Sequence, residues 1–195
     1  MDINFSLCTN LKEIKIDKKI VTCVTKCVLS NCSNLESLDF LTLMPNLSDL
    51  SISGCRNLVN AITSLVEFPH RLRFLDASKI NLDFSNLFRF MEKSPYLEVL
   101  NVVETGEFLR DEMLIESLHL CPLLQTLHVT NCVSLTDKFV EFLLENKPPL
   151  LQLLALTGIK AKAETVALLQ KKYPLLQIHF VSSKLKKLIV NRLHV

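Results

Sequence analysis

The chain has 195 residues, of which 49% are hydrophobic, so it can build a sizeable core within one or two globular domains. Its 22 basic and 20 acidic residues nearly cancel, so no global field would hold it on nucleic acid or on an anionic membrane. The longest apolar stretch, 148–159, is interrupted by Gln152 and is shorter than the roughly 20 residues that cross a bilayer. We therefore expect neither a nucleic-acid partner nor a membrane span.

The N-terminal segment carries the first copy of a motif that recurs along the chain. The clearest copies are INFSLCTNL (3–11), CVLSNCSNL (27–35), LSISGCRNL (50–58) and LHVTNCVSL (127–135). Each copy has an apolar residue, any residue, another apolar residue, then Cys three positions later and Leu three positions after that. Weaker copies complete a register in which an apolar residue opens each repeat three positions before the motif. These opening residues are Val24, Leu47, Leu72, Leu97, Leu124, Leu151 and Leu175.

A short strand is predicted directly after each opening residue. The third and fifth positions after the opening are apolar, as with Leu50 and Ile52 in the repeat that opens at Leu47. Alternation with a period of two indicates a strand. Successive openings lie 23 to 27 residues apart, inside the window of roughly 20 to 29 residues that is typical of leucine-rich repeats.

Helices are predicted between each strand and the next proline, because proline cannot continue a helix and is tolerated just before a strand. The stretch 135–147 is amphipathic, and Thr136 or Asp137 can cap its N-terminus. All seven prolines precede an opening residue by one to three positions: Pro45, Pro69, Pro95, Pro122, Pro148, Pro149 and Pro174.

Two N-terminal segments look like strands but are expected to be helical. LESLDFLTL begins at Leu35, only 12 residues before Leu47, and a solenoid turn cannot close in that length. Leu35 is therefore expected to begin a helix that ends near Met44. LKEIKI, from Leu11, is expected in the helical part of the first repeat.

These elements predict an α/β fold: a right-handed leucine-rich repeat solenoid with parallel strands on its concave face and helices on its convex face. We expect a single domain over 1–195, with a partial N-terminal repeat at 1–23 and about seven repeats after it. The basic, alternating segment 184–195 is expected to cap the last repeat. Because the first motif copy starts at Ile3 with no polar cap before it, we also expect the sequence to be a piece of a longer protein.

The repeats resemble the cysteine-containing class of leucine-rich repeats. In that class Cys follows the strand, Leu-Thr-Asp starts the helix, and Cys-Pro precedes the next strand. This chain has Cys132 followed by Leu-Thr-Asp at 135–137, and Cys121 followed by Pro122. The best-known members are substrate-recognition subunits of cullin-type ubiquitin ligases, which carry an F-box ahead of the repeats, and no F-box is recognisable here. The resemblance implies cullin-ligase components as partners, contacted through a region that this sequence lacks.

The concave face holds the candidate binding residues, because side chains at the first, second and fourth positions after each opening project from it. Its middle is acidic around two apolar spots, Phe74 and Val99, which occupy the same position of adjacent repeats. An exposed aromatic ringed by charge is typical of a binding hot spot. Alternatively, Phe74 only covers a neighbouring side chain and the acids are solvated. The predicted partner-binding residues are Asp49, Arg73, Phe74, Asp76, Glu98, Val99, Asn101, Gln125 and His128.

No metal, cofactor or catalytic site is predicted. Cys27 and Cys32 occupy inward repeat positions and lack zinc-site spacing. His128 and His179 share a repeat position two strands apart, on the order of 10 Å, which is too far for one zinc ion. The three glycines are isolated and form no phosphate-binding loop, and no nucleophile elbow is present.

The seven cysteines are an odd number without close-set pairs, which is typical of reduced thiols in the cytosol or nucleus. Together, these features predict a protein–protein interaction module that is not an enzyme. Substrate recognition for a cullin-type ubiquitin ligase is the first interpretation, on the family resemblance. A free-standing scaffold or inhibitor without ligase association is the alternative.

Overall fold

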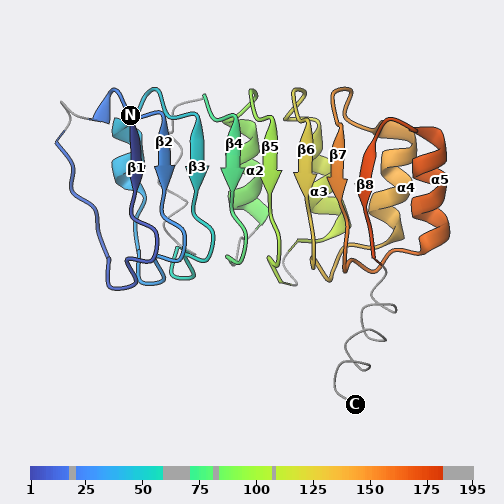
Figure 1. The fold of residues 1–195 in the computed structure, drawn as a ribbon, viewed down its shortest axis with the longest axis horizontal. Coiled ribbons are helices and arrows are strands. Elements are labelled where there is room, and N and C mark those ends of the chain that lie inside the picture. The colour runs from blue at the N-terminus through green and yellow to red at the C-terminus, as the bar shows by residue number, and fades with distance from the viewer. Residues whose placement is uncertain (18–20, 59–70, 81–83, 107–108, 182–195) are drawn as a thin grey trace, which may run out of the picture.

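Eight short parallel strands form one sheet in which every strand pairs with the next along the chain (Figure 1). The computed structural model describes residues 1–17, 21–58, 71–80, 84–106 and 109–181. The third position of each repeat is in register across the whole sheet, from Ile3 beside Cys27 to Leu154 beside Ile178. The strands are β1 (Asp2–Asn4), β2 (Lys26–Val28), β3 (Asp49–Ser51), β4 (Phe74–Asp76), β5 (Val99–Asn101), β6 (Thr126–His128), β7 (Leu153–Ala155) and β8 (Gln177–His179).

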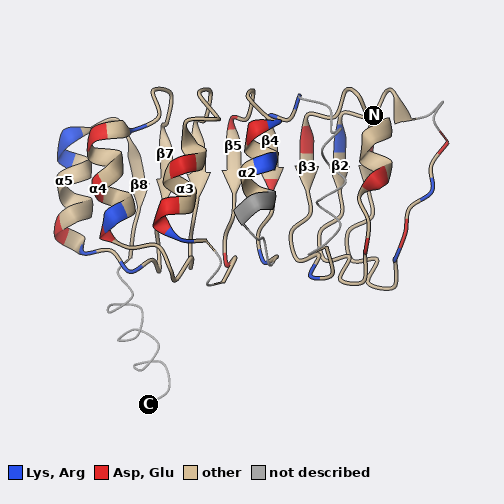
Figure 2. Ribbon diagram, turned by 180° about the vertical axis from the view of Figure 1, so that it is seen from behind, with Lys and Arg blue, Asp and Glu red and all other residues tan. Residues whose placement is uncertain are grey.

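The helices lie along one face of this sheet and leave the other face uncovered (Figures 1 and 2). They are the 3-10 helix η1 (Asp39–Leu43) and the α-helices α2 (Phe84–Glu92), α3 (Asp111–Leu118), α4 (Asp137–Asn146) and α5 (Ala163–Lys172). Thr136 is the N-cap of α4, and its hydroxyl accepts a hydrogen bond from the Lys138 backbone N–H at 3.2 Å. None of the described helices combines the length and apolar character needed to cross a bilayer. The predicted α/β solenoid is confirmed.

The core runs between the sheet and the helices. The side chains at the opening, third and fifth positions of the central repeats are fully buried. Leu124, Leu127 and Val129 hold these positions in one repeat. The eighth position faces the preceding repeat: Cys55 Sγ donates to the carbonyl of Leu29 and Cys132 Sγ to that of Val102, both at 3.0 Å. The repeats that carry Cys32, Cys55 or Cys132 therefore stack on the preceding repeat through apolar contacts and a hydrogen bond from the cysteine thiol.

A left-handed residue ends the turn after each of the strands β1 to β7, at the seventh position after the opening. Its N–H donates to the backbone of the next repeat, as Asn131 does to Thr157 at 2.8 Å. The left-handed residues are Leu7, Asn31, Gly54, Lys79, Glu104, Asn131 and Gly158, with φ between 56° and 86°. Glycine is needed where two repeats approach closely: a Cβ on Gly158 would lie 2.4 Å from Asn131 Oδ1.

Two helix predictions in the N-terminal third are wrong. Residues 35–38 have no helical structure, and only η1 follows them. The repeat that contains η1 opens at Val24 and is the shortest, with 23 residues before the next opening. The repeats that contain α3 and α4 have 27 residues each. The segment from Leu11 is likewise not helical over 11–17, and the backbone N–H of Glu36 donates to the carbonyl of Lys12 at 3.0 Å.

The last repeat opens one residue later than predicted. Leu175 is 95% exposed, and Leu176 takes the buried position. The N–H of Leu176 donates to the carbonyl of Tyr173, which matches the bond from Leu151 to Pro148 one repeat earlier. The buried opening residue of the last repeat, Leu176, is therefore one residue closer to its strand than Leu151 is in the repeat before.

Two further predictions concern the ends of the chain. The structure contradicts the prediction for Cys8, and the predicted C-terminal cap is not among the residues that it describes. Cys8 is exposed rather than turned inward, and it follows β1, the edge strand of the described sheet. The expected cap at 184–195 lies outside the described residues.

Candidate protein-binding surface

The uncovered face of the sheet carries three parallel rows of side chains, one for each outward position of the repeat. The first-position row includes Arg73, Glu98 and Gln125, just ahead of the strands. The second-position row places Asp49, Phe74 and Val99 side by side on β3, β4 and β5. The fourth-position row places Asp76, Asn101 and His128 side by side on β4, β5 and β6. All nine predicted residues therefore lie on one face of four adjacent strands.

Phe74 and Val99 form the apolar centre of this surface. Both side chains are half-buried rather than fully exposed, so the prediction of an exposed aromatic residue is only partly met. A half-buried ring loses less conformational entropy when a partner covers it than a free surface side chain would. This geometry suits a preformed apolar contact point.

The acidic side chains around this centre have hydrogen-bond partners within the protein, and one of them, Glu98, also has an ion-pair partner. Arg73 binds Glu98 through two contacts, with Nε at 2.9 Å and Nη2 at 2.7 Å from the same carboxylate oxygen. Asp49 accepts a short hydrogen bond from the Ser48 hydroxyl. The middle of the face is thus less acidic than the sequence pattern indicates, because the charge of Glu98 is balanced by its neighbour.

Asp76 is held in a fixed orientation. Its Oδ1 accepts from the Ser78 backbone N–H at 3.1 Å and its Oδ2 from the Ser51 hydroxyl at 3.3 Å. Sequence reasoning missed Ser78 because it does not lie on the concave face. The spacing Asp-x-Ser is the signal that could have found it, since a carboxylate commonly accepts from the N–H two residues later.

Two polar atoms of the fourth-position row have no hydrogen-bond partner within the described part of the chain. They are Asn101 Oδ1 and His128 Nε2, and both are enclosed by protein. Burial lowers the pKa of His128, the nearby His179 lowers it further, and Asp76 opposes both effects. His128 is therefore half-buried and favours the neutral form, contrary to the expectation of a simple surface histidine. No feature of the sequence identifies these unpartnered atoms.

The histidines and cysteines do not form a metal site in the described residues. His128 and His179 are separated by the strand that carries Ala155. No group of three potential ligands gathers anywhere in that part of the structure. Burial raises the pKa of the Cys27, Cys55 and Cys121 thiols to about 12, so these side chains stay protonated at neutral pH.

Comparisons with known proteins find similarity in structure and not in sequence. No family model matches the chain, and no curated protein matches it. A solved internalin from Listeria monocytogenes superimposes with a TM-score of 0.60 over 92% of this chain, at 14% identity. The fold is a leucine-rich repeat solenoid. A protein from Bacteroides fragilis superimposes with a TM-score of 0.55 over 84% of this chain, at 18% identity.

The solenoid described here spans about half of each of these solved chains. It covers 47% of the internalin and 57% of the Bacteroides protein. Identities of this size establish the fold alone. The binding properties of this chain must therefore be argued from its own surface.

Proposed function

We propose that this solenoid is a non-catalytic protein-binding module and that its partner docks on the concave face around Phe74 and Val99. The observation that carries the proposal is the half-buried apolar pair Phe74 and Val99 on the uncovered face, with the carboxylates of Asp49 and Asp76 beside it. A bound protein that covers the two apolar side chains removes their remaining surface from water. A basic group on that protein would pair with the two carboxylates.

The partner would present hydrogen-bond donors and a basic group to this face. The carboxylates of Asp49 and Asp76 flank the apolar centre, and neither forms an ion pair with another described residue. Neutral His128 leaves the approach of a positive charge unopposed. We therefore expect an Arg- or Lys-containing segment with an apolar side chain beside it.

The test is a charge reversal with a matched control. Asp49→Lys/Asp76→Lys/Glu98→Lys should lose the partner captured by the unaltered chain in affinity purification with mass spectrometry. The control reverses three exposed acids on the convex helices, Glu116→Lys/Glu141→Lys/Glu164→Lys, for the same change in net charge. Equal capture by the reversal variant and the control would refute a concave binding site.

Within this role we propose substrate recognition for a cullin-type ubiquitin ligase. The support is the resemblance of the repeats around Cys121 and Cys132 to the cysteine-containing class. Seven free thiols fit the reducing cytosol or nucleus where such ligases act. Cullin components that co-purify with the full-length gene product would support this assignment. A stable complex that lacks them would instead identify a free-standing scaffold or inhibitor.

A further inference from the structure

A row of apolar residues, three of them exposed and one half-buried, follows the edge of the solenoid where the strands begin. It occupies the position just before the opening in four successive repeats and consists of Tyr96, Leu123, Leu150 and Leu175. Tyr96, Leu150 and Leu175 are 55%, 44% and 95% exposed. An exposed proline precedes each of them: Pro95, Pro122, Pro149 and Pro174. We refer to these eight residues as the apolar edge, none of which is among the nine predicted residues of the concave face.

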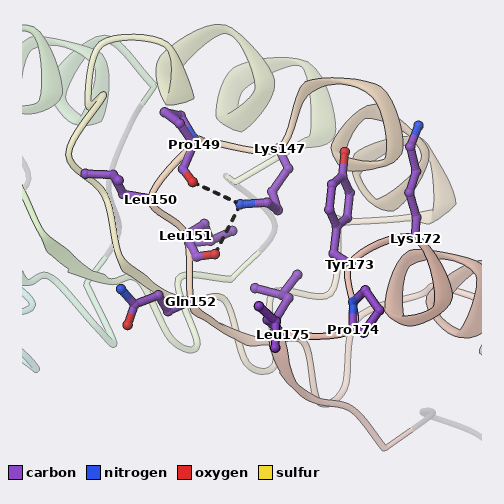
Figure 3. A pocket seen from close by; sticks show the side chains of 10 residues that line it. Lys147, Pro149, Leu150, Leu151, Gln152, Lys172, Tyr173, Pro174 and Leu175 are labelled. Carbon is purple, nitrogen blue, oxygen red and sulfur yellow. Dashed lines mark hydrogen bonds between the residues drawn. The ribbon is translucent and has the colours of Figure 1, made fainter.

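The apolar edge is hollowed at both ends. A pocket of about 390 Å³ lies between the turn that precedes β7 and the turn that precedes β8, with Leu150 and Leu175 in its lining. Figure 3 shows the two leucines in this lining together with Pro149 and Pro174. A second pocket, of about 460 Å³, is lined by Tyr96 and Leu123. A row of apolar side chains that ends in a pocket on each side offers places to seat apolar side chains of a partner.

Internal hydrogen bonds fix the walls of the first pocket. Lys147 Nζ donates to the carbonyls of Pro148 at 2.8 Å and Leu151 at 3.2 Å, and it lies 5.5 Å from the centre of the Tyr173 ring. The Tyr173 hydroxyl donates to the carbonyl of Leu144 at 2.8 Å. These polar groups are therefore satisfied, and the pocket presents a preformed apolar wall that need not rearrange on binding.

The charges that border the apolar edge are mainly positive. Lys147 and Lys172 line one pocket, and Arg71 and Arg73 line the other. Glu98 is the one carboxylate among the described lining residues, and Arg73 pairs with it. Lys172 pairs with Glu145 outside the lining, so Arg71 and Lys147 supply the positive charge that no carboxylate of the described residues balances. A partner segment with acidic residues beside its apolar ones complements this border.

The spacing of the row identifies the form of that segment. The ladder of hydrogen bonds continues to the first position of each repeat, as from Gln152 N–H to the carbonyl of Gln125 at 2.8 Å. Neighbouring members of the row are therefore about one strand spacing apart, about 4.8 Å. Residues three or four apart on a helix advance about 4.5 to 6 Å, whereas alternate residues of an extended strand advance about 6.6 Å. A helix matches the row better.

The geometry points to the apolar edge as a second docking surface, one that takes an acidic amphipathic helix of another protein. The row is about 14 Å long, three strand spacings, and a helix of about ten residues spans it. Charge disfavours two other occupants. The chain's own segment 184–195 is basic, and a second copy would bring the same positive border to this edge.

Selection from a displayed library of helix-forming 14-residue peptides tests this surface on the complete chain. We expect the enriched peptides to carry apolar residues three and four apart, flanked by Asp and Glu. Their affinity should fall at least tenfold for Leu150→Glu/Leu175→Glu. The matched control, Val133→Glu/Leu168→Glu, changes two other exposed apolar residues and should leave the affinity within twofold. Circular dichroism of both variants checks that they are folded.

Three results would overturn the proposal. They are a selection without enriched peptides, enrichment of basic peptides, and binding that both variants weaken equally. Sedimentation of the unaltered chain tests self-association. A dimer that Leu150→Glu/Leu175→Glu dissociates would assign the edge to a second copy instead. Because the concave residues are unchanged in both variants, failure here leaves the proposed function intact. The pocket altered by Leu150→Glu/Leu175→Glu contains none of the three acids reversed in the test of the proposed function, so the two failures can be told apart.

Discussion

Gly158 is the position where one added methyl group should disturb the stacking of two repeats most directly. Its φ of +86° is left-handed, and an alanine there costs roughly 1–2 kcal/mol. The new Cβ would also lie 2.4 Å from Asn131 Oδ1. The asparagine side chain must move, and its hydrogen bond to Glu104, 3.1 Å long, is lost. That bond contributes about 1 kcal/mol.

The total for Gly158→Ala is therefore about 2–3 kcal/mol, the sum of the backbone and side-chain effects. For a chain of this length it lowers Tm by about 4–12 °C. Urea unfolding followed by circular dichroism measures the change. Repeating the substitution in an Asn131→Gly background separates the two effects, because the clash and the lost bond are then absent.

In that background Gly158→Ala should cost only the backbone part, which gives a coupling of about 1 kcal/mol between the two sites. Two outcomes would refute this reasoning. A loss below about 0.5 kcal/mol for Gly158→Ala would contradict the left-handed conformation. An equal loss in both backgrounds would contradict the contact with Asn131. Gly54, whose added Cβ would lie at the same distance from Asn31, allows the measurement to be repeated in a second pair of repeats.

Three further predictions concern buried or half-buried groups. Of the seven cysteines, only Cys8 and Cys23 are exposed. A thiol reagent at pH 8 should therefore label two cysteines rapidly in the native chain and all seven in denaturant. Rapid labelling of a third cysteine in the native chain would contradict the burial of the other five. Asp111 is buried and accepts from the Thr136 N–H at 2.8 Å and its hydroxyl at 2.5 Å, so Asp111→Ala should lower the free energy of unfolding by about 2–4 kcal/mol, and Asp111→Asn, which keeps one acceptor, by less. The lowered pKa of His128 means that the unfolded chain binds a proton more readily; stability from this group is complete above the ordinary histidine pKa and is lost as pH falls through it. Urea unfolding at pH 7.5 and 5.5 should therefore show a smaller pH effect for His128→Asn than for the unaltered chain, and equal effects would refute the assignment.

The sheet and its core could be predicted from the sequence because the same pattern of apolar residues recurs in every repeat. The alternation at positions such as Leu127 and Val129 would be weak evidence alone, since short apolar runs also suit helices. Recurrence at a spacing of 23 to 27 residues removes that ambiguity. Gly54 and Gly158 share the seventh position, and both mark left-handed turns. The same turn at Lys79 has no compositional signal.

The binding surface was less predictable, because its properties depend on pairs of residues from different repeats. Position in the repeat places Arg73 and Glu98 in one row, but the side-chain rotamers decide that they pair with each other. The same holds for His128, whose enclosed nitrogen follows from the side chains packed around it. The prediction of a helix from Leu35 to near Met44 was wrong for a different reason. The repeat that opens at Val24 is too short for the α-helix that longer repeats accommodate.

The apolar edge did leave a signal in the sequence. Pro-Leu-Leu-Gln occurs at 122–125, 149–152 and 174–177, and the second leucine of each copy is the buried one: Leu124, Leu151 and Leu176. Aligning these copies would have assigned the last opening to Leu176 instead of Leu175. The core needs only that second leucine. The first leucine is half-buried at Leu123 and exposed at Leu150 and Leu175. Exposed apolar surface favours aggregation unless something covers it. The repetition of this leucine along one edge therefore supports a docking role for that edge rather than a structural one.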